Sequence, residues 1–334
     1  MAFSLEEPRA EARGSSQDGK ILNTTSFRKG LPVLSRLKLF VALSRTPHAL
    51  LDMATPGLAA LLWLGGFPPV ETVILGLITV FAGYTSVYAL NDVVDHRWDK
   101  EKLQRVRSLD TENDLDVTSV RHPIAQDMLE FREGLIWVIA WAILALGGAY
   151  VLNPLCAIIF LSACVLEAVY CLLLRVSYLR TFLSGAVKTS GAIAAVLAVD
   201  SSPSAPFLFV LFFWVFFWEI GGQNIPNDWA DREEDKRLGA KTLPVHLGVE
   251  RASLWTMVSL FIAVGMSLLL FRVISYKIDL SYVVASLAIG FFFLLVPAYK
   301  LYKARDRFHA AALFNRASYY PLALLIVVAF RSIT

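Results

Sequence analysis

The chain has 334 residues, of which 56% are hydrophobic and 18% are charged, and its mean hydropathy is +0.57. Soluble domains are typically about 45–50% apolar and about 25% charged. This composition excludes an ordinary soluble domain and favours an integral membrane protein.

In chain order, a polar segment comes first and long apolar blocks follow. Residues 1–40 predict a disordered, cytoplasmic tail, and residues 41–334 predict one membrane domain. Each apolar block is about as long as the 20 residues that cross a hydrocarbon layer of ~30 Å. The nine blocks are residues 47–66, 69–90, 133–152, 154–174, 179–199, 205–222, 252–273, 279–298 and 313–331. The predicted fold is therefore an all-α, polytopic bundle of nine transmembrane helices.

Basic residues are concentrated in one set of connections between these blocks. The N-terminal tail, the loops 91–132 and 221–251, the turn 175–180 and the segment 299–316 hold 27 of the 31 lysines and arginines. The positive-inside rule then places the N-terminus and both long loops in the cytoplasm and the C-terminus outside. The same distribution argues against nucleic-acid binding, and no obligate protein partner is evident.

An acidic motif occurs twice, after the second and after the sixth apolar block. Residues 91–99 and residues 227–235 both read N-D-x-x-D-x-x-x-D, offset by 136 residues. Each copy follows an even-numbered block, so both lie on the same side of the membrane in a parallel internal repeat. On a helix, the three aspartates of each copy share one face.

Three carboxylates on one face repel each other unless cations lie between them. Mg²⁺ binds one or two carboxylates and completes its shell with phosphate oxygens and water, so two facing motifs predict a diphosphate held through bridging metal ions. A solvated helix end is the alternative for one copy, but two matching copies disfavour it. The expected catalytic residues are Asp92, Asp95, Asp99, Asp228, Asp231 and Asp235. The expected metal ligands are Asn91, Asp95, Asp99, Asp228, Asp231 and Asp235.

Basic groups follow each motif. Gly239 is typical of a residue just past a helix end, and Lys241 beyond it could contact a phosphate oxygen. Arg121, in the Arg-His-Pro segment 121–123, is the corresponding candidate after the first motif. An ordinary cytoplasmic positive charge is the alternative for either residue.

With these motifs, the chain from about Arg45 to its end resembles the UbiA superfamily of intramembrane prenyltransferases. That family has nine helices and two aspartate-rich motifs after helices 2 and 6, and residues 241–248 (KTLPVHLG) are similar to its segment after the second motif. The resemblance implies a tyrosine near the end of helix 4 followed by a lysine, and here Tyr170 is followed by Arg175 instead. Arg45 resembles a further basic position. The expected diphosphate-binding residues are Asn91, Asn227, Tyr170, Arg175, Lys241, Arg121 and Arg45.

One segment departs from the family pattern. Between Asp99 and Arg121 lie 21 residues that include the acidic run 110–116. This connection is longer than the family usually has, which puts the acceptor in doubt.

The resemblance implies transfer of a prenyl group from an allylic prenyl diphosphate, with Mg²⁺, or Mn²⁺ in its place, at two or more positions. Aromatic faces could stabilise the carbocation; the candidates are Tyr84, Tyr88, Phe213, Trp214, Phe217 and Trp218. The expected acceptor is hydrophobic or aromatic, with a quinone precursor as first choice, in a prokaryotic plasma membrane. The alternatives are a phosphoribosyl or other lipid-acceptor transferase of the same superfamily, or a cation-coupled transporter. Transporter sites usually lie near the bilayer midplane, which disfavours the last.

Overall fold

A computed structural model describes residues 32–105, 120, 122–276 and 279–333. The chain divides into two units, residues 1–37 and residues 38–334, and the second unit carries the bundle described below. Residues 1–31 of the predicted disordered tail lie outside the described residues, whereas residues 33–40 belong to a helix, Val33–Leu43. Within the described residues every regular element is helical.

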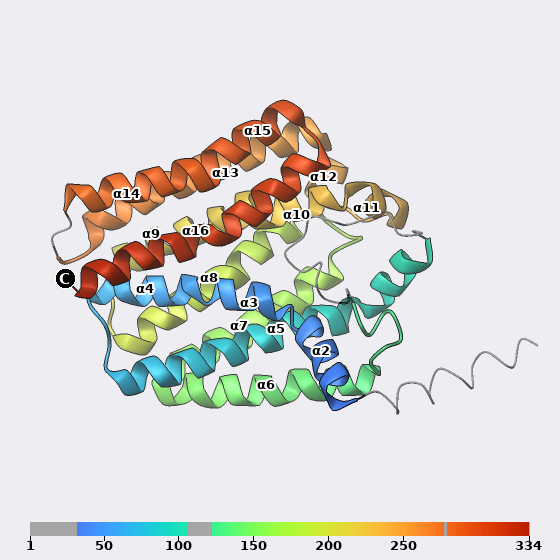
Figure 1. Cartoon of the computed structure of the whole chain (residues 1–334), viewed down its shortest axis with the longest axis horizontal. Helices are drawn as coiled ribbons and strands as arrows, with labels where there is room; N and C mark the ends of the chain where they lie inside the picture. Colours follow the sequence, from blue (N-terminus) through green and yellow to red (C-terminus); the bar gives the residue numbers. More distant parts are fainter. Residues whose placement is uncertain (1–31, 106–119, 121, 277–278, 334) are drawn as a thin grey trace, which may run out of the picture. The chain divides into compact units, whose positions relative to one another are not determined.

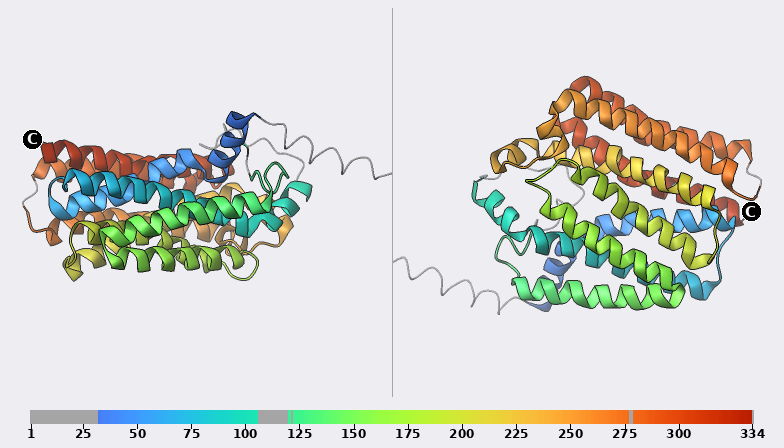
Figure 2. Two further views of the ribbon diagram at one scale, coloured as in Figure 1. Left: turned by 90° about the horizontal axis from the view of Figure 1, so that it is seen from below. Right: turned by 180° about the vertical axis from the view of Figure 1, so that it is seen from behind.

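Eight helical stretches among the described residues are long and apolar enough to cross a membrane. The long helices run side by side in each view (Figures 1 and 2). The elements are α2 (Val33–Leu43), α3 (Thr46–Asp52), α4 (Ala54–Leu64), α5 (Val70–Arg105), α6 (Phe131–Leu152), α7 (Pro154–Leu172), α8 (Arg180–Val199), α9 (Ala205–Trp218), η2 (Glu219–Asn224), α10 (Ile225–Ala230), α11 (Arg232–Leu238), α12 (Leu243–His246), α13 (Gly248–Val273), α14 (Leu280–Gly290), η3 (Phe291–Leu295), α15 (Val296–Ala304) and α16 (Arg307–Ile333).

The predicted first span, residues 47–66, consists of two successive helices, α3 and α4, which meet at Met53. Neither reaches the length of a span alone, so the count of nine stays a prediction. The predicted second span is much longer than its apolar block, because α5 continues to Arg105 and includes the whole first acidic motif. The sixth block likewise continues through η2 into α10.

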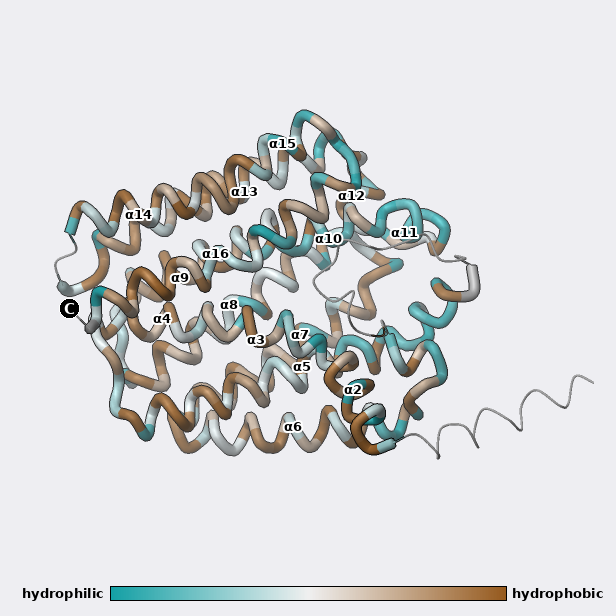
Figure 3. The backbone as a smooth tube through the Cα atoms, in the orientation of Figure 1, coloured by the Kyte–Doolittle hydropathy of each residue, from teal (hydrophilic) through white to brown (hydrophobic). Residues whose placement is uncertain are grey.

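Helix α5 packs against α6 and α7, α7 against α8, and α8 against α4 and α9. Helix α16 packs against α4, α10 and α15, and α9 packs against α13. Hydrophilic residues gather where α5 ends and α11 and α12 lie, whereas the long helices are largely hydrophobic (Figure 3). Both acidic motifs therefore lie at one polar end of the bundle.

Two glycines let the π-helical turn η2 approach its neighbours closely. A Cβ on Gly221 would lie 3.0 Å from the carbonyl oxygen of Thr256, and one on Gly222 would lie 2.9 Å from the Cβ of Ala317. Single π-turns inside longer helices are frequent at functional sites. Here the turn fixes Glu219, at its start, against the interior of the bundle.

Candidate active site

A cavity of about 420 Å³ lies between α4, α5, α7, α8, η2 and α16. Its lining is mainly apolar and reaches from Phe67 and Pro68 to a polar end near the acidic motifs. Four of the predicted diphosphate-binding residues line it, together with Asn224, which the sequence did not single out. The four are Arg45, Asn91, Tyr170 and Asn227.

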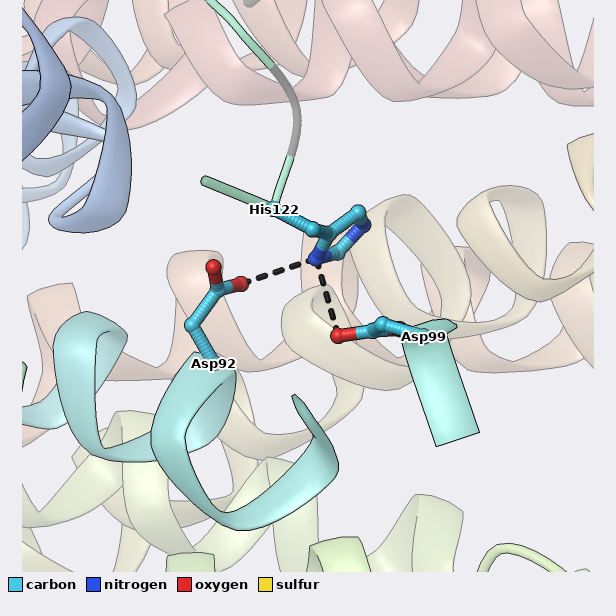
Figure 4. A group of neighbouring side chains, drawn as sticks. All are labelled: Asp92, Asp99 and His122. Carbon is cyan, nitrogen blue, oxygen red and sulfur yellow. Dashed lines mark hydrogen bonds and ion pairs between the residues drawn. The ribbon is translucent and has the colours of Figure 1, made fainter. Parts of the chain in front are cut away.

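The first motif is continuous within α5, so its three aspartates share one face as predicted. Asp92 is buried, and the Nδ1 atom of His122 lies 2.9 Å from both Asp92 Oδ1 and Asp99 Oδ2 (Figure 4). Burial by itself would lower the pKa of His122, but Asp99 and Asp92 raise it to about 9. His122 is therefore an imidazolium at neutral pH and lies where a cation is required between two carboxylates.

Asn91, the first residue of the motif, contacts α7. Its side-chain amide donates to Glu167 Oε1 at 2.7 Å and to Cys171 Sγ at 3.3 Å. Arg45 lies at the same end, with its Nη2 3.9 Å from Asp92 Oδ1.

The second motif is not one helix, so the prediction of an identical three-aspartate face is wrong there. Helix α10 ends at Ala230, and Asp231 leaves the helical conformation with φ −97° and ψ 6° before α11 begins. Asp228 and Asp235 are buried on either side of this break. Burial, and then the neighbouring Asp228 carboxylate, raise the pKa of Asp235 to about 7.

Lys102 links the two motifs. It lies three residues after Asp99 on α5, and its ammonium is 2.8 Å from Asp231 Oδ2 and 3.0 Å from Glu234 Oε2. The extension of α5 beyond the apolar block is what allows this contact. No pattern in the sequence indicated a role for Lys102.

Arg180 is the buried cation that the sequence analysis missed. Its guanidinium stacks on the Tyr170 ring at 4.0 Å, donates to the Tyr170 hydroxyl, and lies 4.0 Å from Asp228 Oδ1. Asn224 donates to the same hydroxyl at 3.0 Å. The Nε and Nη1 groups of Arg180 have no hydrogen-bond partner in the described part of the chain, so they remain available to an anion.

The other predicted bases lie elsewhere. Arg175 donates to Glu101 Oε2 at 2.6 Å and stacks on Trp98 at 4.0 Å. Lys241 has an exposed side chain, and its backbone N–H donates to the carbonyl of Leu174 at 2.7 Å. Arg121 lies outside the described residues. Gly239 ends α11 with φ 69°, as predicted.

The acidic residues fit a divalent cation. Asp95 Oδ1 and Asp228 Oδ2 are buried oxygens that have no hydrogen-bond partner among the described residues, and the same holds for Asn224 Oδ1. A buried oxygen without a hydrogen-bond partner destabilises the folded protein unless a bound ligand coordinates it. Mg²⁺ prefers carboxylate and amide oxygens, so the donor set is suitable for it.

The fold and this site define a class: helical membrane proteins in which an apolar cavity ends at paired acidic motifs. Residues 53–320 match the model of the UbiA prenyltransferase family, and the chain belongs to that family. It is a prenyltransferase and an integral membrane protein, as the sequence predicted.

Individual relatives are distant. The digeranylgeranylglyceryl phosphate synthase of Thermococcus sibiricus is 26% identical over 218 residues, which are 65% of this chain and 71% of that protein. The apo structure of a UbiA homolog from Aeropyrum pernix K1 superposes with a TM-score of 0.67 at 16% identity and covers 86% of this chain and 97% of that one. The structure of a UbiA homolog from Archaeoglobus fulgidus bound to DMAPP and Mg²⁺ superposes with a TM-score of 0.63 at 15% identity and covers 87% of this chain and 99% of that one. These two structures establish the fold.

Proposed function

We propose that this chain transfers a prenyl group from an allylic prenyl diphosphate to a hydrophobic or aromatic acceptor, with Mg²⁺ bound at both acidic motifs. The observation that carries the proposal is the cavity: its mainly apolar lining reaches Asn91 and Asn227, the first residues of the two acidic motifs, and Tyr170, whose hydroxyl accepts from Arg180. An apolar tail fits the cavity and a diphosphate fits its polar end. The Archaeoglobus fulgidus homolog bound to DMAPP and Mg²⁺ supports a prenyl diphosphate and Mg²⁺ as the ligands.

The chain's own groups would bind and orient the leaving diphosphate. Asp95 and Asp228 would hold Mg²⁺, which supplies positive charge to the departing anion. Arg180 donates Nε–H and Nη1–H to the same anion, and Tyr170 fixes the guanidinium plane. Such donors, fixed before the reaction, contribute several kcal/mol at a developing charge.

The cavity also protects a carbocation. Of the six predicted aromatic candidates, Tyr84 and Tyr88 line the cavity, and the other four do not. Trp214 and Trp218 belong to the hydrophobic core instead. The rest of the lining is mainly apolar and limits the access of water, which would otherwise capture the cation.

The acceptor has two candidate classes. The sequence reading favours an aromatic quinone precursor, whereas the Thermococcus sibiricus relative is named for a glyceryl phosphate product. A phosphoribosyl donor is the remaining alternative within the family. We also propose that the protein lies in a prokaryotic plasma membrane. Its N-terminus and both acidic motifs then face the cytoplasm.

Purified protein in lipid vesicles tests this function directly. One labelled prenyl diphosphate is offered with a panel of quinone precursors and glycerol lipids, and phosphoribosyl diphosphate is offered as the competing donor. We expect prenyl transfer that stops in EDTA and returns with Mg²⁺ or Mn²⁺. Transfer from phosphoribosyl diphosphate alone would contradict the proposed donor.

A further inference from the structure

A buried polar cluster lies deeper in the membrane than the acidic motifs. Lys188 donates to Asp52 Oδ2, and the hydroxyl of Tyr88 donates to the same oxygen. Asp52 is 1% exposed and does not line the cavity, whereas Lys188 and Tyr88 do. Asp52 therefore fixes the positions of Lys188 and Tyr88 without itself lining the cavity.

A second carboxyl group lies opposite this pair. Glu219 is 7% exposed, accepts a hydrogen bond from Ser184 at Oε1, 2.7 Å away, and lines the cavity. Its other oxygen, Oε2, is 3.8 Å from Lys188 Nζ and has no hydrogen-bond partner in the described chain. The hydroxyl of Tyr84, also on the cavity wall, likewise has no such partner there.

Helix geometry gives the depth of the cluster. Tyr84 precedes Asp92 by eight residues on α5, and Lys188 follows Arg180 by eight on α8, so each lies about 12 Å along its helix from the diphosphate end. Glu219 lies nine residues before Asp228. With the diphosphate at the polar end, the cluster lies beside the first carbons of the prenyl chain, where an acceptor must reach.

The charges of the cluster restrict that acceptor. The Asp52 carboxylate neutralises the Lys188 ammonium. Separating a buried ion pair of this kind is costly, because it leaves a buried charge without compensation. Glu219 then adds a carboxyl group with no cation of its own. A buried anion here would meet the Glu219 carboxyl group, whereas the two basic groups described beside it already contact Asp52: Lys188, and His48 with its Nε2 3.9 Å from Asp52 Oδ2. This arrangement disfavours an anion.

From this arrangement we infer that Glu219 and Tyr84 bind an uncharged hydroxyl group at the reacting end of the acceptor. The hydroxyl donates to Glu219 Oε2 and accepts from Tyr84. An acceptor carrying a carboxylate or phosphate next to its reacting hydroxyl is rejected. The inference rests on the proposed prenyl transfer and specifies its second substrate.

Two matched pairs of probes test the inference with a fixed labelled donor. The pairs are a 1-O-alkylglycerol with its 3-phosphate, and 1,4-dihydroxynaphthalene with its 2-carboxylate. We expect kcat/KM of the wild-type protein to favour the uncharged member. In Glu219→Gln the preference should fall at least ~10-fold, because the amide removes the repelling charge and keeps the Ser184 contact, while the KM for the donor is unchanged.

Tyr84→Phe gives a second measurement in a fold-preserving variant. It should lower kcat/KM for hydroxyl acceptors about 10-fold, the scale of one lost hydrogen bond in a buried site. Tyr282→Phe is the matched control, since Tyr282 is also buried with an unpartnered hydroxyl among the described residues but lies outside the cavity lining.

Three results would overturn the inference: preference for the anionic member of both pairs, unchanged selectivity in Glu219→Gln, or no turnover of either uncharged probe. Mg²⁺-dependent binding of the labelled donor is measured in parallel on the same preparations. Absence of donor binding would contradict the proposed function itself, and this readout separates the two failures.

Discussion

Tyr170 organises the polar end of the cavity by holding two neighbours in place. Its hydroxyl accepts from Arg180 and from Asn224, and its ring supports the Arg180 guanidinium. Arg175, five residues after Tyr170, instead contacts Glu101 and Trp98. Arg180 lies 4.0 Å from Asp228 of the second motif, whereas Arg175 pairs with Glu101, so Arg180 is the better placed of the two arginines.

Arg180→Ala should raise the KM for the prenyl diphosphate by roughly 10-fold or more, since hydrogen bonds to charged groups are each worth about 1.5–3 kcal/mol. The KM for the acceptor should change far less, and Arg180→Lys should retain part of the activity. Arg175→Ala is the control and should have a small effect. Steady-state kinetics decide between them: a large donor effect in Arg175→Ala with none in Arg180→Ala would return the role to Arg175.

The affinity for Mg²⁺ should rise with pH in two steps. Asp235 has a raised pKa of about 7, so it is mostly protonated at pH 6 and becomes a carboxylate ligand by pH 8. His122, with a pKa of about 9, competes as an imidazolium for Asp92 and Asp99 until it loses its proton. Calorimetric titration of Mg²⁺ between pH 6 and 10 measures both steps.

Asp235→Asn should remove the step near pH 7, and His122→Ala the step near pH 9. An affinity that does not change with pH in the wild-type protein would contradict this account.

For single residues, the sequence did not predict which side chains the turns between helices bring into the site. The N-D-x-x-D-x-x-x-D pattern identified the carboxylates of both motifs, but its spacing gives a shared helix face only in the first motif, where the helix is continuous. Arg180 could not be chosen over Arg175, because both follow Tyr170 across a turn whose path the sequence does not determine. His122 belongs to the Arg-His-Pro segment 121–123, but its position between Asp92 and Asp99 depends on how the loop folds back onto α5.

At the scale of elements, the extension of α5 beyond the apolar block joins the two halves of the site. Only this extension places Lys102 against Asp231 and Glu234. Hydropathy predicted a span ending near residue 90, because the polar turns that follow leave the membrane even though the helix continues. The breaks at Met53 and Asp231 were not predictable, since neither carries a proline or glycine at the break itself.

Lys102→Met should destabilise the metal-free protein, because it leaves two partly buried carboxylates without their cation. Mg²⁺ should then raise Tm more in this variant than in the wild type, since the metal replaces the lost charge. Lys100→Met is the matched control: Lys100 pairs with Asp127 at an exposed position, where ion pairs contribute about 0–1 kcal/mol. Equal Mg²⁺ shifts in the two variants would argue against a shared cation position.

At the scale of the whole molecule, the apolar exterior and the polar end define how the bundle spans the membrane. Side chains such as Ile136, Ile143 and Val151 on α6 are exposed, as expected of a surface that faces lipid. Composition and block length predicted a bundle of membrane-spanning helices with an apolar exterior, because the hydrocarbon thickness constrains helix length directly. Which helices enclose the cavity depends on packing that no single block encodes.

Orientation follows from the basic residues and stays a prediction. Glu233, at a variable position of the second motif on α11, and Glu71, at the start of α5, lie at opposite ends of the bundle and are each replaced singly by cysteine. In a background without Cys156, Cys164 and Cys171, Glu233→Cys should react with an impermeant maleimide only from the cytoplasmic side. Glu71→Cys should react only from outside, and the reverse pattern would invert the proposed topology.

If metal ions bound at both acidic motifs drive prenyl transfer, Asp95→Ala and Asp231→Ala should both lose turnover. With saturating Mg²⁺ and labelled donor, each variant should lose at least ~10²-fold in kcat, the scale of one lost electrostatic group in an active site. Glu233→Ala, which removes an exposed acid at a variable position of the second motif, should remain near wild type. Normal turnover in EDTA, or in the protein carrying both alanines, would contradict the account.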